Sequence, residues 1–257
     1  MPEIPRVELP LSTRVVDFIS DLHLAPELPR TLAALERYLE ATSADALVIL
    51  GDLFEAWVGD DASALPFEGH CVELLARAAK RRPVYVMRGN RDFLLGEAFF
   101  AETGAVDLPD PVALHAPGIA SQPILLSHGD ALCLADTAYQ QFRATVRAPE
   151  WHSAFLSKPL AERQAIAAQM RAASREHQHK REPITYADAD PALTGEWLAA
   201  AGASILVHGH THRPQSEQRA EGWQRHVLSD WDCDHAARAE VLRWTAQGFT
   251  RLAPSEA

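Results

Sequence analysis

The sequence lacks any apolar run that approaches the roughly 18 consecutive residues needed to cross a bilayer. Its opening stretch, MPEIPRVELPLSTR, also lacks the short apolar segment of a secretory signal. Both absences argue against a membrane-spanning or exported protein. On the sequence alone we expect a cytoplasmic protein.

Cysteine is scarce, with three residues among 257, at Cys71, Cys133 and Cys233. No two of them form the closely spaced pair of a zinc ribbon, and an odd number of distant cysteines does not suggest a disulfide framework. We therefore expect reduced thiols, which again fits a cytoplasmic compartment.

Positive charge is in the minority, since 24 Lys and Arg face 35 Asp and Glu, for a formal net charge of −11. Proteins that bind DNA or RNA through their surface usually carry a basic footprint, so no nucleic-acid partner is expected. Hydrophobic residues make up 47% of the chain and charged residues 23%, as in ordinary soluble domains. The length fits one large α/β domain, or one domain with a substantial insertion.

Short apolar runs are present instead of long ones. Each is rich in Val, Ile or Leu and has the length of a buried strand. Apolar residues three and four positions apart predict helices at residues 30–41 and 69–82, and residues 225–244 fit two further strands joined by a loop. Strands alternating with helices predict an α/β fold. The five runs are residues 14–20, 45–50, 83–88, 123–127 and 204–207.

Polar side chains follow each of these runs, in the stretches DLHL, GDLFEAW, GNRDF, HGD and HGHTH. In open α/β sheets the carboxyl ends of the strands face a common crevice, where ligands bind. His208 and His210 differ by two positions, so in extended chain they point to the same side. The side chains predicted to meet are Asp21, His23, Asp52, Asn90, His128, His208 and His210.

Two carboxylates, one amide oxygen and four imidazoles suit Mn²⁺, Fe²⁺, Co²⁺ or Zn²⁺ better than Ca²⁺. Seven groups are too many for one tetrahedral ion, and they fit two ions that share a carboxylate. Two metals about 3.5–4 Å apart can clamp a phosphate and activate a water molecule. The expected reaction is therefore displacement at phosphorus.

The ordered set D-x-H, G-D, G-N-[HR]-[DE], H and G-H-x-H resembles the calcineurin-like metallophosphoesterase superfamily over residues 14–214. This resemblance implies a β-sandwich flanked by helices, with the dimetal site at one edge. It gives His212 no ligand role, so a supporting or turn role is expected there. One metal would take Asp21, His23, Asp52 and His210, and the other would take Asp52, Asn90, His128 and His208.

Arg91 stands where most members of the superfamily have histidine. The stretches ILGDLFEAWVGDD, RGNRDFLLG and SHGDALCLADTAYQQFR resemble the branch that hydrolyses the pyrophosphate of UDP-2,3-diacylglucosamine in lipid A biosynthesis. The resemblance implies a Mn²⁺-dependent attack of water on the α-phosphorus, giving UMP and 2,3-diacylglucosamine 1-phosphate. Asp52 and Arg91 receive the catalytic roles, because arginine can fork onto a phosphate although it cannot act as a general acid. Substrate contacts are implied for Asn90, Arg91, Asp136, Ser174, Gln178, His208 and either Lys180 or Arg181.

Residues 137–190 interrupt the strand pattern and leave residues 1–136 and 191–257 as the core. Residues 155–180 have a helical pattern, and residues 141–183 combine a basic excess with apolar side chains. The segment can be an amphipathic hairpin packed on the core, or a lid that shelters acyl chains and meets anionic headgroups. The lid interpretation places the protein peripherally on the cytoplasmic face of the inner membrane.

Two other functions stay open at this point. The same dimetal chemistry could act on a soluble nucleotide or nucleotide sugar, or the fold could serve as a non-enzymatic scaffold. A scaffold should have lost metal ligands, and none of the expected ones is missing. Arg91 and the apolar, basic insertion favour the lipid-linked substrate.

Overall fold

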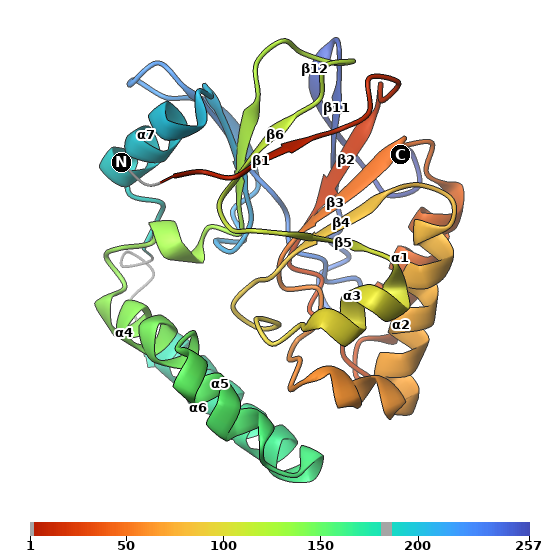
Figure 1. The fold of residues 1–257 in the computed structure, drawn as a ribbon, viewed down its shortest axis with the longest axis vertical. Helices are drawn as coiled ribbons and strands as arrows, with labels where there is room; N and C mark the ends of the chain where they lie inside the picture. The colour runs from red at the N-terminus through yellow and green to blue at the C-terminus, as the bar shows by residue number, and fades with distance from the viewer. Residues whose placement is uncertain (1–2, 181–186) are drawn as a thin grey trace.

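The computed structural model describes residues 3–180 and 187–257, and the side chains of residues 173–180 lie outside that description. Two six-stranded sheets pack against each other in the middle of the molecule (Figure 1). Sheet I has the order β1-β6-β7-β8-β10-β9, and sheet II has the order β12-β11-β2-β3-β4-β5. The prediction of an α/β fold with a helix-flanked β-sandwich is confirmed.

Sheet II carries three of the predicted strands side by side and parallel, in the order β2, β3, β4. Sheet I carries the other two, β7 and β8, also parallel, with Ser127 opposite His208. Residues 225–244 contribute two strands joined by a loop, as expected, and these two strands lie in different sheets. The five predicted strands are therefore present, but they belong to two separate sheets.

The strand bounds follow the apolar runs closely. Sheet I consists of β1 (Arg6–Glu8), β6 (Val112–His115), β7 (Ile124–Ser127), β8 (Ile205–His208), β10 (Gln224–Val227) and β9 (Gln215–Gln218). Sheet II consists of β12 (Gly248–Leu252), β11 (Val241–Thr245), β2 (Val16–Ile19), β3 (Ala46–Leu50), β4 (Val84–Met87) and β5 (Val106–Leu108).

Alternate residues of the central strands point into two different cores. Phe18 and Val48 of sheet II meet Leu126 and Val207 of sheet I between the sheets. The intervening residues face outward and are covered by helices, so the strands are buried on both sides. The helices α1 (Pro29–Ala41), α2 (Pro66–Ala79) and α3 (Glu97–Thr103) cover sheet II, and α7 (Pro191–Ala201) covers sheet I.

The insertion forms α4 (Thr137–Val146), α5 (Pro149–Leu156) and α6 (Leu160–Lys180), which extend from the sandwich as an arm (Figure 1). The buried guanidinium of Arg163 fixes the base of α6, donating to the carbonyls of Val58 and Lys158 and to Asp61. The predicted helices are thus present. The division of the chain into a core and a lid at residues 137 and 190 stays a prediction.

Candidate metal centre

The carboxyl ends of the five predicted strands meet at one edge of the sandwich. The backbone N–H of Asp21 donates to the carbonyl of Gly51 at 3.1 Å, joining the loops after β2 and β3. The N–H of Gly209 donates to the carbonyl of His128 at 2.9 Å, joining the loops after β7 and β8. Across the two sheets, the N–H of His210 donates to Asp21 Oδ2 at 3.0 Å. The edge is therefore a single site built by both sheets.

The backbone turns sharply at the polar residues of this edge. Left-handed conformations cost roughly 1–3 kcal/mol for residues other than glycine and tend to gather at functional sites. Because the chain leaves the extended geometry here, consecutive polar side chains can converge on one point. The non-glycine residues with positive φ at this edge are Asp21 (55°), His23 (48°), Asp52 (52°), His210 (65°) and His212 (53°).

Two glycines let the carboxylates approach the backbone. A Cβ at Gly89 would lie 2.1 Å from Asp52 Oδ1, and one at Gly209 would lie 2.4 Å from Asp21 Oδ2. Neither distance is possible between real atoms, so only glycine fits at these two positions.

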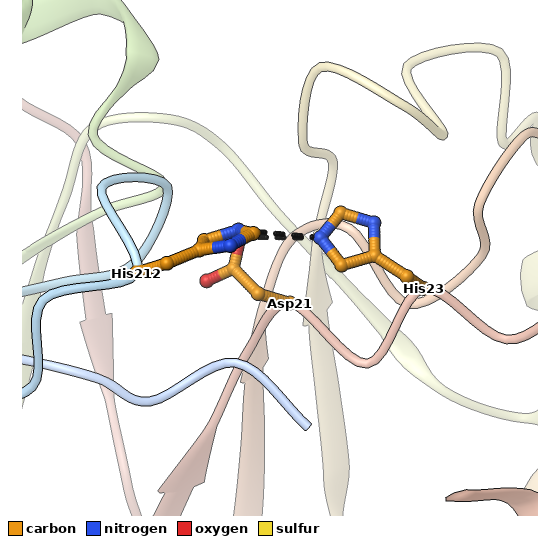
Figure 2. A group of neighbouring side chains, drawn as sticks. All are labelled: Asp21, His23 and His212. Atoms are coloured by element: carbon orange, nitrogen blue, oxygen red, sulfur yellow. Dashed lines mark hydrogen bonds and ion pairs between the residues drawn. The ribbon is translucent and has the colours of Figure 1, made fainter. Parts of the chain in front are cut away.

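One group of side chains is Asp21, His23 and His212 (Figure 2). The Nε2 atoms of the two imidazoles face each other at 3.3 Å. His212 Nε2 lies 3.3 Å from Asp21 Oδ1, and His23 Nε2 lies 3.9 Å from Asp52 Oδ2. Two imidazole nitrogens and two carboxylates thus surround one point.

A second group lies on the other side of Asp52. Asp52 Oδ1 is 3.7 Å from His128 Nε2. Asn90 Oδ1 lies 2.9 Å from His128 Nε2 and 2.8 Å from His210 Nδ1. Asp52 therefore presents one oxygen to each group, which is the arrangement expected of a shared carboxylate.

The structure does not bring His208 into either group. His208 is the last residue of β8, two positions after Leu206, so strand alternation puts it on the same face as Leu206, which packs in the core beside α7. Its Nδ1 lies 2.9 Å from the Gly209 carbonyl, and its ring is fully buried. The expectation that His208 and His210 point to the same side is wrong, because His210 adopts a left-handed conformation. The geometry gives no support to a ligand or substrate role for His208.

The electrostatics of the centre suit a cation. Burial works to raise the pKa of Asp21, but the neighbouring His212 holds it well below its usual range. Burial opposes a proton on His128, yet Asp52 and Asp21 raise its pKa to about 9. Burial and the neighbouring His128 lower the pKa of His210 to about 4. The buried carboxylate of Asp21 thus stays negative and attracts positive charge, and the mixed oxygen and nitrogen donors are those of a borderline divalent ion.

A cavity of about 970 Å³ opens on this centre. Its wall includes His23, Asp52 and Asn90 together with His210 and His212. From there it runs between the core and the arm, and its surface becomes largely apolar. The apolar part of the wall includes Trp57, Phe93, Leu94, Phe142, Trp151, Phe155 and Met170.

Apart from His208, the predicted substrate residues either line this cavity or lie outside the described side chains. Arg91 lines the cavity, and its backbone N–H donates to Asp52 Oδ1 at 2.8 Å. Asp136 also lines it, as the residue that caps the start of α4. The side chains of Ser174, Gln178 and Lys180, and Arg181 as a whole, lie outside the described residues.

Several residues at the centre escaped the sequence analysis. Asp130 Oδ2 accepts hydrogen bonds from Tyr139 at 2.5 Å and from Arg143 at 2.8 Å, which ties α4 to the loop of His128. His212 was visible in the same HGHTH stretch, but the sequence predicted only a supporting role for it. Its role depends on the end of β8 at His208, which the sequence does not fix. Tyr139 and Arg143 reach the centre from the insertion, so the spacing of the ligand motifs could not predict their contacts.

The fold and the two groups of candidate metal ligands are those expected of a metallophosphoesterase. The calcineurin-like phosphoesterase family matches residues 15–214, and the chain belongs to this family. The chain is 47% identical to UDP-2,3-diacylglucosamine hydrolase of Chromobacterium violaceum, over 92% of this chain and 98% of that protein. It is 46% identical to the enzyme of that name from Ralstonia nicotianae, over 89% of this chain and 88% of that protein.

Proposed function

We propose that this chain hydrolyses the pyrophosphate of UDP-2,3-diacylglucosamine to UMP and 2,3-diacylglucosamine 1-phosphate in lipid A biosynthesis. The observation that carries the proposal is the 47% identity to the C. violaceum hydrolase. Because that match covers 92% of the chain, it includes most of the helical insertion as well as the metal centre.

The proposed ligand set differs from the sequence-based one at its last two positions. It assigns His210 where His208 was expected, and His212 where His210 was expected. Mn²⁺ suits these donors. When bound, two such ions place positive charge on the phosphate and make a water molecule nucleophilic near neutral pH. One ion would be held by Asp21, His23, Asp52 and His212, and the other by Asp52, Asn90, His128 and His210.

Arg91 is proposed to bind the phosphates. Its backbone is fixed to Asp52, so its side chain starts from the rim of the metal centre and lines the same cavity. A guanidinium can make two parallel hydrogen bonds to a phosphate and lowers the cost of the charge that develops there. The contacts assigned to Asp136, Ser174, Gln178 and Lys180 or Arg181 stay part of this proposal.

The apolar part of the cavity is proposed to hold the two acyl chains. Trp151 and Phe155 of α5 stack at 4.6 Å, and Phe93 of the core packs on Trp151 at 5.9 Å. Burying a methylene group contributes about 0.8 kcal/mol to binding, so this apolar wall favours a substrate with long acyl chains. Its position next to the metal centre supports the interpretation of the insertion as a lid.

Peripheral binding to the inner face of the inner membrane belongs to the same proposal. Within the part of the chain that the structure describes, no helix is both long and apolar enough to cross a bilayer. Phe142, Leu156 and Met170 of the insertion are more than a third exposed. Such side chains could enter the lipid surface from which the substrate is drawn.

The test is release of UMP by the purified protein with Mn²⁺, from the diacylated UDP-sugar and from UDP-N-acetylglucosamine. We expect turnover of the first and little of the second. Trp151→Ala should lower kcat/KM for the acylated substrate and leave the Mn²⁺ content unchanged. Equal kcat/KM on both substrates would instead support a soluble nucleotide sugar, and binding of Mn²⁺ without any hydrolysis would support a scaffold.

A further inference from the structure

We infer that Glu55 and Asp230 are positioning residues that hold His23 and His212, so that the metal position of Asp21 binds its ion more tightly than the other position. The inference rests on the dinuclear centre of the proposed function. It adds two residues that lie outside the ligand set.

Glu55 stands behind His23. Its Oε2 lies 3.2 Å from His23 Nδ1, and its Oε1 lies 3.9 Å from the guanidinium of Arg171 on α6. A neutral imidazole carries one proton, and a carboxylate beside Nδ1 keeps that proton on Nδ1. The Nε2 lone pair is then free to face the point shared with Asp21 and His212.

Asp230 stands behind His212 at a longer distance. Its Oδ2 lies 3.7 Å from His212 Nδ1, within the range of an ion pair, and accepts a hydrogen bond from Arg238. The backbone fixes it there, because the N–H of the next residue, Trp231, donates to the carbonyl of Asp21 at 3.0 Å. Each imidazole of this position therefore has a carboxylate behind it, and each carboxylate has an arginine behind it.

The other metal position is supported differently. The Nδ1 of His128 faces the carbonyl oxygen of Leu50 at 2.8 Å, which is a neutral acceptor. The nearby carboxylate of Asp130 is already held by Tyr139 and Arg143. A carbonyl fixes the tautomer of a histidine as well as a carboxylate does, but it adds no negative charge.

The consequence is unequal affinity. A carboxylate behind a ligating histidine makes the imidazole more basic, and losing such a partner typically costs about 10–100-fold in metal affinity. Glu55 is closer to its histidine than to its arginine, whereas Asp230 is closer to Arg238 than to His212. Glu55 should therefore contribute more than Asp230.

The experiment is a titration of the metal-free full-length protein with Mn²⁺, following free Mn²⁺ by electron paramagnetic resonance. Wild type should take up two ions in two steps of different affinity. Glu55→Gln should weaken the tighter step about tenfold or more, and Asp230→Asn should weaken it less. The weaker step should change less than about twofold in both variants, because Glu55 and Asp230 contact the histidines of the tighter position and His128 has the Leu50 carbonyl as its partner.

Glu8→Gln is the matched control. Glu8 faces His115 Nδ1 at 3.1 Å, which is the same type of pair, but His115 ends β6 at the edge of the sandwich opposite the metal centre. This variant should titrate like wild type. If Glu55→Gln titrates like wild type, or weakens both steps equally, the inference is wrong. If wild type takes up no second ion, the dinuclear function itself fails. Should Asp230→Asn not fold, the Glu55 variant alone decides.

Discussion

His23 and His212 meet through their Nε2 atoms at 3.3 Å, although 189 positions separate them in the sequence. The contact joins the end of β2 in sheet II to the loop after β8 in sheet I. No hydrogen-bonded strand pair connects these two strands. The polar centre therefore brings together side chains that the sheets themselves leave apart.

This contact predicts that His212 is a metal ligand and that His208 is not. His212→Ala should lose about one Mn²⁺ per chain and several orders of magnitude in kcat, because a group facing Asp21 is removed. His208→Gln should keep both ions, since its Nδ1 lies against the Gly209 carbonyl and not in either group of ligands. The check is metal content by atomic emission beside UMP release. Loss of metal in the His208 variant with none in the His212 variant would restore the sequence-based assignment.

Arg91→Ala is expected to separate substrate binding from metal binding. The variant keeps the backbone N–H that holds Asp52, so its Mn²⁺ content should equal that of wild type. Its kcat/KM should fall about 10- to 100-fold. This loss corresponds to roughly 1.5–3 kcal/mol of transition-state stabilisation, as expected for a charge-assisted hydrogen bond. Steady-state kinetics and metal analysis on the same preparation give the answer. A variant depleted of metal would contradict the assignment.

Arg163→Met is expected to destabilise the base of the arm. The substitution leaves the buried carbonyl of Val58 and the partly buried carbonyl of Lys158 without this donor, and an unpaired buried polar group costs about 1–3 kcal/mol. The free energy of unfolding, measured in urea, should fall by about 2–4 kcal/mol. Lys158→Ala is the control, because its ion pair with Glu162 is largely exposed and should contribute less than about 0.5 kcal/mol.

His226 should make the stability depend on pH. Burial and the nearby Arg251 lower its pKa to about 4, against about 6.5 in the unfolded chain. Because the unfolded chain binds the proton first, this contribution is complete above pH 6.5 and is lost as the pH falls towards 4. Between pH 7.5 and pH 5, His226→Gln should lose about 1–2 kcal/mol less than wild type. Urea unfolding at the two pH values tests this, and equal losses would contradict it.

The apolar runs predicted five strands, but not how the strands divide between two sheets. Phe18 and Ile19 both belong to cores, on opposite faces of β2, so the pattern of β2 lacks the alternation that would mark a face. β9 has the sequence QSEQ and no apolar residue, and only its pairing with β10 makes it a strand. Such edge strands are fixed by tertiary contacts, which no local pattern contains.

The sequence predicted which kinds of residue form the metal centre, but not which histidines of HGHTH face it. Asp21, Asp52, Asn90 and His128 follow strands whose ends are clear in the sequence, and the structure brings them together. The three histidines of HGHTH are different, because their directions depend on left-handed φ values at His210 and His212. Nothing in the residue types announces that change of direction. Glu55 and Asp230 depend on neighbours from other segments and were beyond sequence reasoning.

The order of the strands has a consequence for the synthesis of this chain. β2 lies between β3 and β11, and β1 pairs with β6, so strands made early wait for partners made much later. While the ribosome is still adding residues 51–240, β2 has one hydrogen-bonding edge without its partner strand. An open edge of this kind invites pairing with other chains. The interval before β11 emerges is thus when the nascent protein is most exposed to aggregation and has most to gain from a chaperone.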